Sequence, residues 1–459
     1  MIKYSIKNYF GGIMGKNQYR AERPGTDTYY ITTFGCQMNV RDTQTAAGIL
    51  ESMGYLPAAD PKEAKVLLYN TCCIRDLAER KAYAAIGMAR EIKAKNGGMV
   101  GVFGCMTQQT GAAQELMRRM PFIDFAFGTH QLHRLPEFIH AAQEKGRTTF
   151  FEEGNPALDF DLPAAYGRPP LAYTNIIHGC NNFCSYCIVP YVRGRETSKP
   201  MELILEEART LMDQGFSEIT LLGQNVNSYG NDWGKPQFAK LLRELDAIGV
   251  PRIRFMTSHP KDLSDEVIAA MAECSHVAKQ IHLPVQSGSS RVLRRMNRKY
   301  TRGDYLCLVE KLRAAMPQVG ITTDLIVGFP GESETDFADT LSLCETVRFD
   351  AAFTFNFSKR KGTAAFDMKG EVAKEVMTQR ITTLIDTIKS ISAKTYQGLV
   401  GTEQTVLIEG ESSRDSSCYT GRIDRGITVN FPKGHGVVGD FVPVTITHAK
   451  ANTLFGQER

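Results

Sequence analysis

Residues 178–191 read HGCNNFCSYCIVPY and place Cys180, Cys184 and Cys187 in one short segment with C-x3-C-x2-C spacing. Such spacing lets a loop bring three thiolates to one point, and thiolates are the ligands of iron–sulfur clusters. Three thiolates hold three irons of a [4Fe–4S] cube, so the fourth iron would stay open to a small molecule. A structural zinc site is the alternative, but it takes four ligands, typically from two C-x2-4-C pairs, and His178 lies too close to Cys180 to supply one without strain. The spacing therefore predicts a cluster-binding loop.

The bulk composition favours a cytoplasmic protein of several domains. A chain of 459 residues is long enough for two to four domains. Its 11 cysteines are an odd number with no sign of a secreted disulfide framework, which fits a reducing compartment. No apolar run reaches the ~18 residues of a membrane span. Residues 1–25 are basic but lack an apolar core, so we expect a mobile tail and not a signal peptide, with a transit peptide as the alternative. The net charge of +4 allows an acidic partner without requiring one.

Three apolar runs in residues 26–145 each lead into a cysteine. The runs at 28–34, 66–69 and 99–103 precede Cys36, Cys72 and Cys105, and helices are predicted at 42–53, 76–95 and 114–120. This alternation predicts a flavodoxin-like domain with a parallel sheet, in which ligands bind beyond the carboxyl ends of the strands. The three cysteines would then converge and form a second three-thiolate site. The alternative is that they are small buried residues at strand ends. The neighbouring Cys73 should point the other way.

Residues 146–165 show no period and are interpreted as a linker, after which residues 166–397 alternate again between strands and helices. Strands are predicted at 219–222, 253–256, 280–283, 322–327 and 352–357, and helices at 201–214, 238–247, 264–272, 305–315 and 334–347. Repeated βα units predict a whole or partial parallel barrel with its active groups at the carboxyl ends of the strands. The polar side chains there, which could bind a polar cofactor, are Gln224, Ser258, Gln286 and Asp324. Each could equally cap a helix or complete a turn.

The stretch 291–302 contains five arginines, one lysine and no acidic residue, and residues 359–361 form a second basic cluster. Basic clusters suit the phosphate backbone of nucleic acids, although a solvated helix face is an equally good interpretation. If the stretch binds RNA, charge reversal at Arg294 and Arg298 should weaken binding. Residues 398–459 contain short strands at 404–408, 420–422, 428–431 and 442–449 between glycines, which predicts a small β-barrel.

The cysteine loop resembles the signature of the radical S-adenosylmethionine (SAM) enzymes. Further segments are similar to the methylthiotransferase family within that superfamily. They are TFGCQMN at 33–39, NTCCIR at 70–75, GCM at 104–106, RGRE at 193–196, GQNVNSYG at 223–230, HLPVQSGS at 282–289 and DLIVGFPGE at 324–332. Within the family, residues 36–39, 70–72 with 74–75, and 223–230 look like the MiaB type. The C-terminal segment resembles the TRAM domain, an RNA-binding module. Two positions depart from the family pattern, since Lys361 replaces a proline and Cys73 replaces a small polar residue.

The resemblance implies two [4Fe–4S] clusters and a defined reaction. One cluster on Cys180, Cys184 and Cys187 would bind SAM and cleave it to a radical, with Gln224, Ser258, Gln286 and Asp324 as candidate SAM-binding residues. The other, on Cys36, Cys72 and Cys105, would take part in sulfur insertion. The implied reaction converts N6-(dimethylallyl)adenosine at position 37 of tRNA, in the anticodon stem-loop, to its 2-methylthio form. An electron donor such as flavodoxin or ferredoxin and a monomeric state are also expected.

Two alternatives remain open from the sequence. A sister methylthiotransferase would act on threonylcarbamoyl-adenosine in tRNA or on an aspartate of a ribosomal protein. A protein of a different class would bind RNA through an iron–sulfur domain without catalysis. Cleavage of SAM by the reduced protein discriminates the second alternative from both enzymes.

Overall fold

The computed structural model describes residues 27–73, 76–150, 159–450 and 452–459, and the chain forms two compact units. Unit 1 contains the chain up to Arg168 together with His178–Asn181 and Ile188–Lys199; unit 2 contains Pro169–Ile177, Asn182–Cys187 and Pro200–Arg459. The expected tail at 1–25, part of the expected linker at 151–158, and residues 74 and 75 of the NTCCIR segment lie outside the described residues.

Unit 1 is built on a six-stranded parallel sheet with the strand order β2-β1-β3-β4-β5-β6. This is the flavodoxin-like order. The order in which successive strands are added to the sheet reverses between β1 and β3, and a ligand crevice opens at that point. The strands are β1 (Thr28–Thr33), β2 (Leu56–Pro57), β3 (Val66–Thr71), β4 (Met99–Gly104), β5 (Phe125–Phe127) and β6 (Thr148–Phe150). The helices are α1 (Gln37–Ser52), α2 (Asp76–Asn96), α3 (Ala112–Arg119), α4 (Leu135–Lys145) and the short α5 (Val189–Val192).

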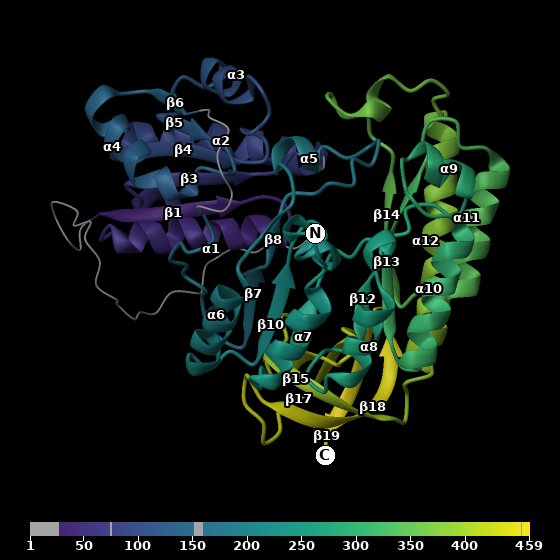
Figure 1. The fold of residues 1–459 in the computed structure, drawn as a ribbon. Coiled ribbons are helices and arrows are strands. Elements are labelled where there is room, and N and C mark those ends of the chain that lie inside the picture. The colour runs from purple at the N-terminus through teal and green to yellow at the C-terminus, as the bar shows by residue number, and fades with distance from the viewer. Residues whose placement is uncertain (1–26, 74–75, 151–158, 451) are drawn as a thin grey trace. The chain divides into compact units, whose positions relative to one another are not determined.

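Two apolar layers sandwich this sheet (Figure 1). Along β3, Val66 and Leu68 pack toward α1 and α4, whereas Leu67 and Tyr69 pack toward α2 and α3. Successive side chains of a strand point to opposite faces, so a strand buried on both faces is apolar throughout. Complete burial of one such side chain stabilises the fold by about 1.5–3 kcal/mol. The sheet is therefore a rigid base for the loops at its carboxyl end.

Unit 2 begins with a parallel βα barrel that is only partly closed. Its strands pair in two sheets whose order follows the chain, β7-β10-β11 and β12-β13-β14, and all of their pairs are parallel. The strands are β7 (Leu171–Asn175), β10 (Glu218–Leu222), β11 (Ile253–Phe255), β12 (Gln280–His282), β13 (Gly320–Val327) and β14 (Ala351–Asn356). The helices are α6 (Met201–Asp213), α7 (Phe238–Ala247), α8 (Asp265–Glu273), α9 (Ser290–Arg295), α10 (Arg302–Ala315), α11 (Glu334–Val347) and α12 (Lys374–Gln397). The short strands β8 (Ile177–His178) and β9 (Thr197–Ser198) pair separately.

A closed five-stranded barrel ends the chain, drawn in yellow in Figure 1. Its strands are β15 (Glu403–Glu411), β16 (Cys418–Arg422), β17 (Thr428–Pro432), β18 (Phe441–Lys450) and β19 (Thr453–Glu458). The buried Glu218 at the start of β10 accepts from Arg254 Nε at 2.8 Å, and Arg254 also donates to the carbonyl of Ile423 in the β16–β17 turn. Burial alone would raise the pKa of Glu218, but the facing arginines hold it below its ordinary value. The small barrel is thus fixed at the amino ends of the βα strands, the end opposite the expected active groups.

The expected fold class is confirmed in all three parts: a parallel-sheet domain, a partial βα barrel and a small β-barrel. The boundaries differ in places. Helix α1 begins at Gln37, directly after Cys36, and not at residue 42 as predicted. Helices α4, α9 and α12 and strands β2, β5, β6 and β19 were not predicted. Among the described residues, no helix combines the length and the apolar character needed to cross a membrane.

Candidate active site

Cys36, Cys72 and Cys105 follow three neighbouring strands of unit 1. Strands β1, β3 and β4 lie side by side in the sheet, and each of the three cysteines stands just beyond a carboxyl end. Cys72 and Cys105 are almost fully buried, while Cys36 is half-buried at the start of α1. The expected convergence at one edge of the sheet is therefore present in the fold.

Two glycines allow these loops to approach one another. Gly35 and Gly104 precede Cys36 and Cys105, and both have positive φ, at 123° and 110°. A Cβ atom at Gly35 would lie 2.8 Å from the Cβ of Cys72, and one at Gly104 would lie 2.5 Å from the Thr71 carbonyl oxygen. Only glycine adopts this backbone and tolerates this proximity without strain. The turns after β1 and β4 are therefore packed directly against the end of β3.

A network of two asparagines fixes the same turns. Asn39 donates through Nδ2 to the carbonyl oxygens of Phe34 and Thr71, at 2.9 and 3.0 Å. Asn70 donates through Nδ2 to the Asn39 carbonyl oxygen at 2.7 Å. Both side chains are fully buried, where a hydrogen-bonded polar group is stable and an unpaired one costs about 1–3 kcal/mol. The network holds the loops that carry Cys36 and Cys72 in one arrangement.

Cys72 and Cys73 have different surroundings. Cys73 belongs to an apolar cluster with Ile86, Ala89 and Met106 on the α2 side of the sheet. Cys72 is not a member of that cluster, and its Cβ lies near the position that a side chain at Gly35 would occupy. Cys105 belongs to that cluster as well, so the close approach of Gly35 to Cys72 is the observation that supports Cys72 as the member of this pair at the site.

A buried arginine from the segment after the cysteine loop joins this group. Arg193 is 2% exposed and belongs to unit 1. Its Nε lies 3.4 Å from Cys105 Sγ, and its Nη2 donates to Asp42 Oδ2 at 2.6 Å and to Asn39 Oδ1 at 3.2 Å. Burial raises the pKa of the Cys105 thiol, and the guanidinium of Arg193 opposes this shift only in part. A cation beside the Cys105 thiol suits its conversion to a thiolate ligand.

The cysteine loop contributes to both units. Cys180 lies in unit 1, where its amide donates to the Gly194 carbonyl oxygen at 3.1 Å; Cys184 and Cys187 lie in unit 2. Within unit 2 the loop is held by the end of α9, because the Ser185 amide donates to the Met296 carbonyl and Asn297 Nδ2 donates to the Phe183 carbonyl, at 2.9 and 2.8 Å. Cys187 donates its amide to the Cys184 carbonyl at 2.9 Å. The loop is thus a fixed element in each unit.

Arg298 is the second buried arginine at a cysteine, and it corrects one of our expectations. It is 7% exposed, and its Nη1 lies 3.4 Å from Cys184 Sγ. Its Nε donates to Tyr300 Oη at 2.7 Å and its Nη2 to the Pro284 carbonyl at 2.5 Å. The prediction that Arg298 faces RNA is therefore wrong: the turn after α9 directs this side chain into the unit. Within the same stretch, Arg291 pairs with Asp336 and Arg295 donates to the Pro330 carbonyl, whereas Arg294 is exposed.

Several buried polar atoms at the carboxyl ends of the barrel strands have no hydrogen-bond partner within the described part of unit 2. They belong to the last residue of β7 and to the loops after β10 and β11, and they are Asn175 Oδ1, Asn225 Oδ1, both amide atoms of Asn227, Ser258 Oγ and His259 Nε2. Each buried polar group left unpaired costs about 1–3 kcal/mol, so these atoms fit a site in which a polar ligand would form hydrogen bonds with them. Asn175 was not predicted, although its place at the end of a barrel strand is the signal that identifies it.

The other candidate SAM-binding residues lie at the same end of unit 2. Gln286 has a positive φ of 72°, and its backbone N–H donates to the backbone carbonyl of Asp324 at 2.9 Å. The half-buried Asp324 side chain lies 3.6 Å from His282 Nε2. Thr257, next to Ser258, also has a positive φ, at 67°. Non-glycine residues in this conformation cost about 1–3 kcal/mol and concentrate at functional sites. Gln224 follows β10 and is half-buried.

Among the described residues, no group of three or more histidine, cysteine or acidic side chains has the spacing to hold a single metal ion; a four-iron cube keeps its thiolates farther apart than one ion does.

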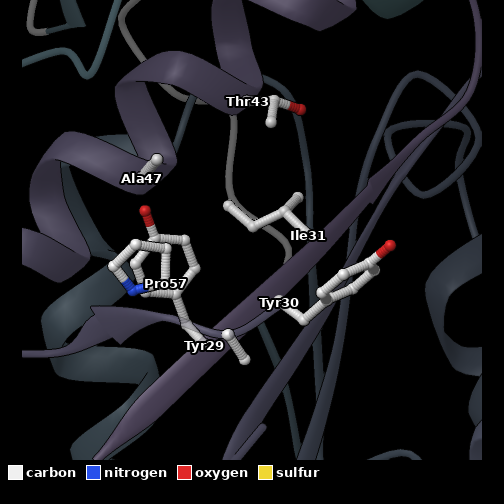
Figure 2. Close-up of a pocket in the computed structure, with 7 residues that line it drawn as sticks. Tyr29, Tyr30, Ile31, Thr43, Ala47 and Pro57 are labelled. Carbon is white, nitrogen blue, oxygen red and sulfur yellow. The ribbon is translucent and has the colours of Figure 1, made fainter. Parts of the chain in front are cut away.

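Figure 2 shows a small pocket of unit 1 on the α1 side of β1, lined by Tyr29, Tyr30, Ile31, Thr43, Ala47, Pro57 and Ala58. None of the candidate cysteines lines this pocket, so it is separate from the site.

Comparison with known families divides the chain into three regions. Residues 174–344 match the radical SAM superfamily, residues 28–128 match an uncharacterised protein family designated UPF0004, and residues 397–457 match the TRAM domain. The first and last of these agree with the resemblances inferred from the motifs. The first match lies in the βα barrel and the second in the parallel sheet; the third runs from Gln397 at the end of α12 through the small barrel.

Curated relatives match nearly the whole chain. The chain is 43% identical over 447 residues to the tRNA-2-methylthio-N(6)-dimethylallyladenosine synthase of Clostridium tetani, which covers 96% of this chain and 98% of the relative. It is 47% identical over 433 residues to the synthase of the same name from Carboxydothermus hydrogenoformans, covering 94% and 98%.

Among solved structures, the radical SAM methyltransferase TsrM from Kitasatospora setae, with cobalamin and a [4Fe–4S] cluster bound, has a TM-score of 0.56 at 15% identity and covers 74% of this chain and 77% of its own. The cobalamin-dependent radical SAM enzyme OxsB has a TM-score of 0.51 at 12% identity and covers 80% and 56%. At these identities the likeness concerns the fold alone.

Proposed function

The chain belongs to the tRNA-2-methylthio-N(6)-dimethylallyladenosine synthase family, and from this membership we propose that it converts N6-(dimethylallyl)adenosine at position 37 of tRNA to its 2-methylthio form. The chain is a radical SAM enzyme and a tRNA methylthiotransferase. The observation that carries the proposal is the identity of 43–47% to curated synthases, extending over 94–96% of the chain. The sister substrates are left as outcomes of the test.

The radical SAM fold brings SAM and a [4Fe–4S] cluster, and the chain's own residues fit both. We propose that Cys180, Cys184 and Cys187 hold this cluster. When bound, the reduced cluster supplies one-electron cleavage of SAM. The unpaired polar atoms of Asn227, Ser258 and His259 would then orient the polar parts of SAM and leave little room for water beside it. The ring of His259 stays neutral, since burial first and then Arg298 lower its pKa to about 2, so it binds as a neutral donor or acceptor.

We propose a second [4Fe–4S] cluster on Cys36, Cys72 and Cys105. The support is the position of all three cysteines beyond adjacent strands, two glycines that let the loops meet, and the buried guanidinium at Cys105. The role of these residues is to keep a sulfur-carrying group in a site that is largely buried, with Cys36 at its more accessible side. Such a group would supply the sulfur that the reaction adds to adenine.

We propose that the tRNA contacts the C-terminal barrel, because this barrel matches the TRAM domain, which the sequence resemblance identifies as an RNA-binding module. The reacting adenine must leave its stack to reach a buried site, as nucleobase-modifying enzymes generally require. A one-electron donor such as flavodoxin or ferredoxin, a monomeric state and a cytoplasmic location complete the proposal. The electron donor follows from the one-electron chemistry of the reaction and the location from its tRNA substrate; the monomeric state is proposed from the sequence alone.

Nucleoside mass spectrometry tests the function. The chain is reconstituted without oxygen with iron and sulfide, then incubated with SAM, dithionite and tRNA that bears isopentenyladenosine. We expect methylthio-isopentenyladenosine and 5′-deoxyadenosine as products. Deoxyadenosine without the methylthio nucleoside, followed by modification of tRNA bearing threonylcarbamoyl-adenosine, would contradict the substrate while preserving the chemistry. No SAM cleavage by a chain with both clusters intact would contradict the enzyme.

A further inference from the structure

Arg298 is a buried cation without a carboxylate partner among the described residues. Its printed contacts are the phenol of Tyr300, the carbonyl of Pro284 and the sulfur of Cys184. Arginine does not lose its proton in proteins, so the charge is permanent. An unbalanced charge in a protein interior is costly, and buried charges are therefore normally paired. The group in this set that a bound cluster would make an anion is Cys184, as a thiolate ligand.

The other groups that face Arg298 remain neutral. Burial raises the pKa of Tyr300, whose phenol accepts from Arg298 Nε, to about 12. His259, whose ring lies 5.7 Å from that of Tyr300, is held neutral by burial. The guanidinium also lies against the Tyr300 ring, with its central carbon 5.0 Å from the ring centroid. These contacts hold the cation in place but do not balance its charge.

We propose that Arg298 is a positioning residue that sets the reduction potential of the cluster held by Cys180, Cys184 and Cys187, by balancing the negative charge that the cluster and its thiolates carry. The inference rests on the proposed function only in requiring that this cluster exists. Potentials of iron–sulfur clusters depend on net charge, on hydrogen bonds to sulfur and on burial, and Arg298 supplies a charge and an N–H group to a ligand sulfur in a buried site. Because reduction adds a negative charge, a fixed cation favours the reduced state and raises the potential.

The segment that carries Arg298 also connects two parts of the site. Arg298 follows Asn297, which holds the Phe183 carbonyl, and its own Nη2 holds the Pro284 carbonyl two residues before Gln286. Tyr300 Oη donates to the Val285 carbonyl at 3.0 Å. The cation is therefore fixed on both the cysteine loop and the β12 loop. A neutral side chain at this position loses the charge, while the bond of Tyr300 to the Val285 carbonyl does not involve residue 298.

The test is a redox titration of one cluster. The first background is the full chain with Cys36, Cys72 and Cys105 changed to alanine, in which iron content and electron paramagnetic resonance establish that one cluster remains. The second background is the unsubstituted chain. There, added SAM perturbs the spectrum of the cluster that binds it and so identifies that cluster. R298Q removes the charge, R298K keeps it, and R295Q is the matched control because Arg295 also bonds a backbone carbonyl but has no described contact with sulfur. SAM affinity is measured for each variant.

We expect R298Q to lower the midpoint potential enough to reduce the ratio of reduced to oxidised cluster at least tenfold at a fixed potential, which is about 59 mV for one electron. R298K should recover most of that shift, and R295Q should show none. If R298Q binds no cluster, recovery of both iron and potential by R298K supports the inference, and failure of R298K overturns it. An unchanged potential in R298Q, or lost SAM affinity alone, overturns it as well. A parent chain without any cluster would overturn the proposed function itself, and the inference with it.

Discussion

The two cysteine groups each contain a buried arginine whose nitrogen lies 3.4 Å from a cysteine sulfur, yet the two cations are balanced differently. Arg193 forms an ion pair with Asp42 at 2.6 Å, and both side chains are at most 5% exposed. Arg298 contacts a neutral phenol and a backbone carbonyl. One arginine is thus already neutralised by the fold, while the other has its charge left for whatever the cysteines bind. The comparison indicates that Arg193 presents a partly balanced charge to its cysteine, whereas Arg298 presents an unbalanced one.

The largest expected effect separates the two groups by reaction. C184A should abolish formation of 5′-deoxyadenosine, since it removes a ligand of the SAM-cleaving cluster. C105A should retain deoxyadenosine formation and lose the methylthio nucleoside. Both products are quantified by mass spectrometry in the same incubation, and C73A, which alters the apolar cluster near the site, is the control for Cys105. C184A should lose the methylthio nucleoside as well, so the two groups do not have separate roles if C105A also loses 5′-deoxyadenosine.

The next effect concerns the ion pair of Arg193. D42N leaves a buried guanidinium without its carboxylate, and breaking such a pair costs about 3–5 kcal/mol. Hydrogen exchange in α1 should therefore become much faster, and the double variant D42N/R193M should recover part of the protection because no charge remains buried. The exposed pair of Glu115 with Arg118 is the control, and E115Q should leave exchange in α1 unchanged. Equal protection in D42N and the unsubstituted chain would show that the pair does not hold the segment.

A smaller effect is expected for the unpaired polar atoms. Ser258 Oγ has no partner within the described structure, so S258A should leave stability nearly unchanged and weaken SAM by about 3- to 10-fold, the value of one hydrogen bond. Ser264 caps α8 by accepting from the Val267 amide, and S264A should instead lose about 1 kcal/mol of stability and keep SAM affinity. Calorimetry and thermal unfolding measure the two quantities. The same result for both serines would remove the distinction between ligand-binding and structural hydroxyls.

The smallest effect is expected on tRNA binding by the exposed part of the basic stretch. Arg294 is exposed on α9, and R294E should weaken tRNA binding a few-fold and reduce its salt dependence by about one unit of slope if the side chain contacts a phosphate. The exposed Arg209 on α6 is the matched control for a change of two charges elsewhere. Filter binding at several salt concentrations gives both affinity and slope. Identical slopes for R294E, R209E and the unsubstituted chain would leave the stretch as a solvated helix face.

The sequence predicts the parallel sheet and the partial barrel because long apolar runs and βα alternation determine them. It does not predict α12, whose buried residues Arg380, Leu384, Ile388, Ser392 and Tyr396 recur every four positions but include polar types. Nor does it predict where Arg298 points, since a run of arginines has the same composition whether its members face solvent or a sulfur. The six cysteines follow from strand ends and loop spacing; the charge balance around them depends on side chains distant in the chain, such as Asp42 and Arg193. The domain limits and the assignment of individual site residues remain predictions.

Iron analysis tests most directly the claim that the chain holds two separate clusters. Three full-length proteins are reconstituted in parallel: the unsubstituted chain, the variant with Cys36, Cys72 and Cys105 changed to alanine, and the variant with Cys180, Cys184 and Cys187 changed to alanine. Iron and sulfide content with Mössbauer spectra should show about eight irons in the first protein and about four in each variant, all in cubane clusters. Full iron content in either triple variant, or about four irons in the unsubstituted chain, would contradict the account.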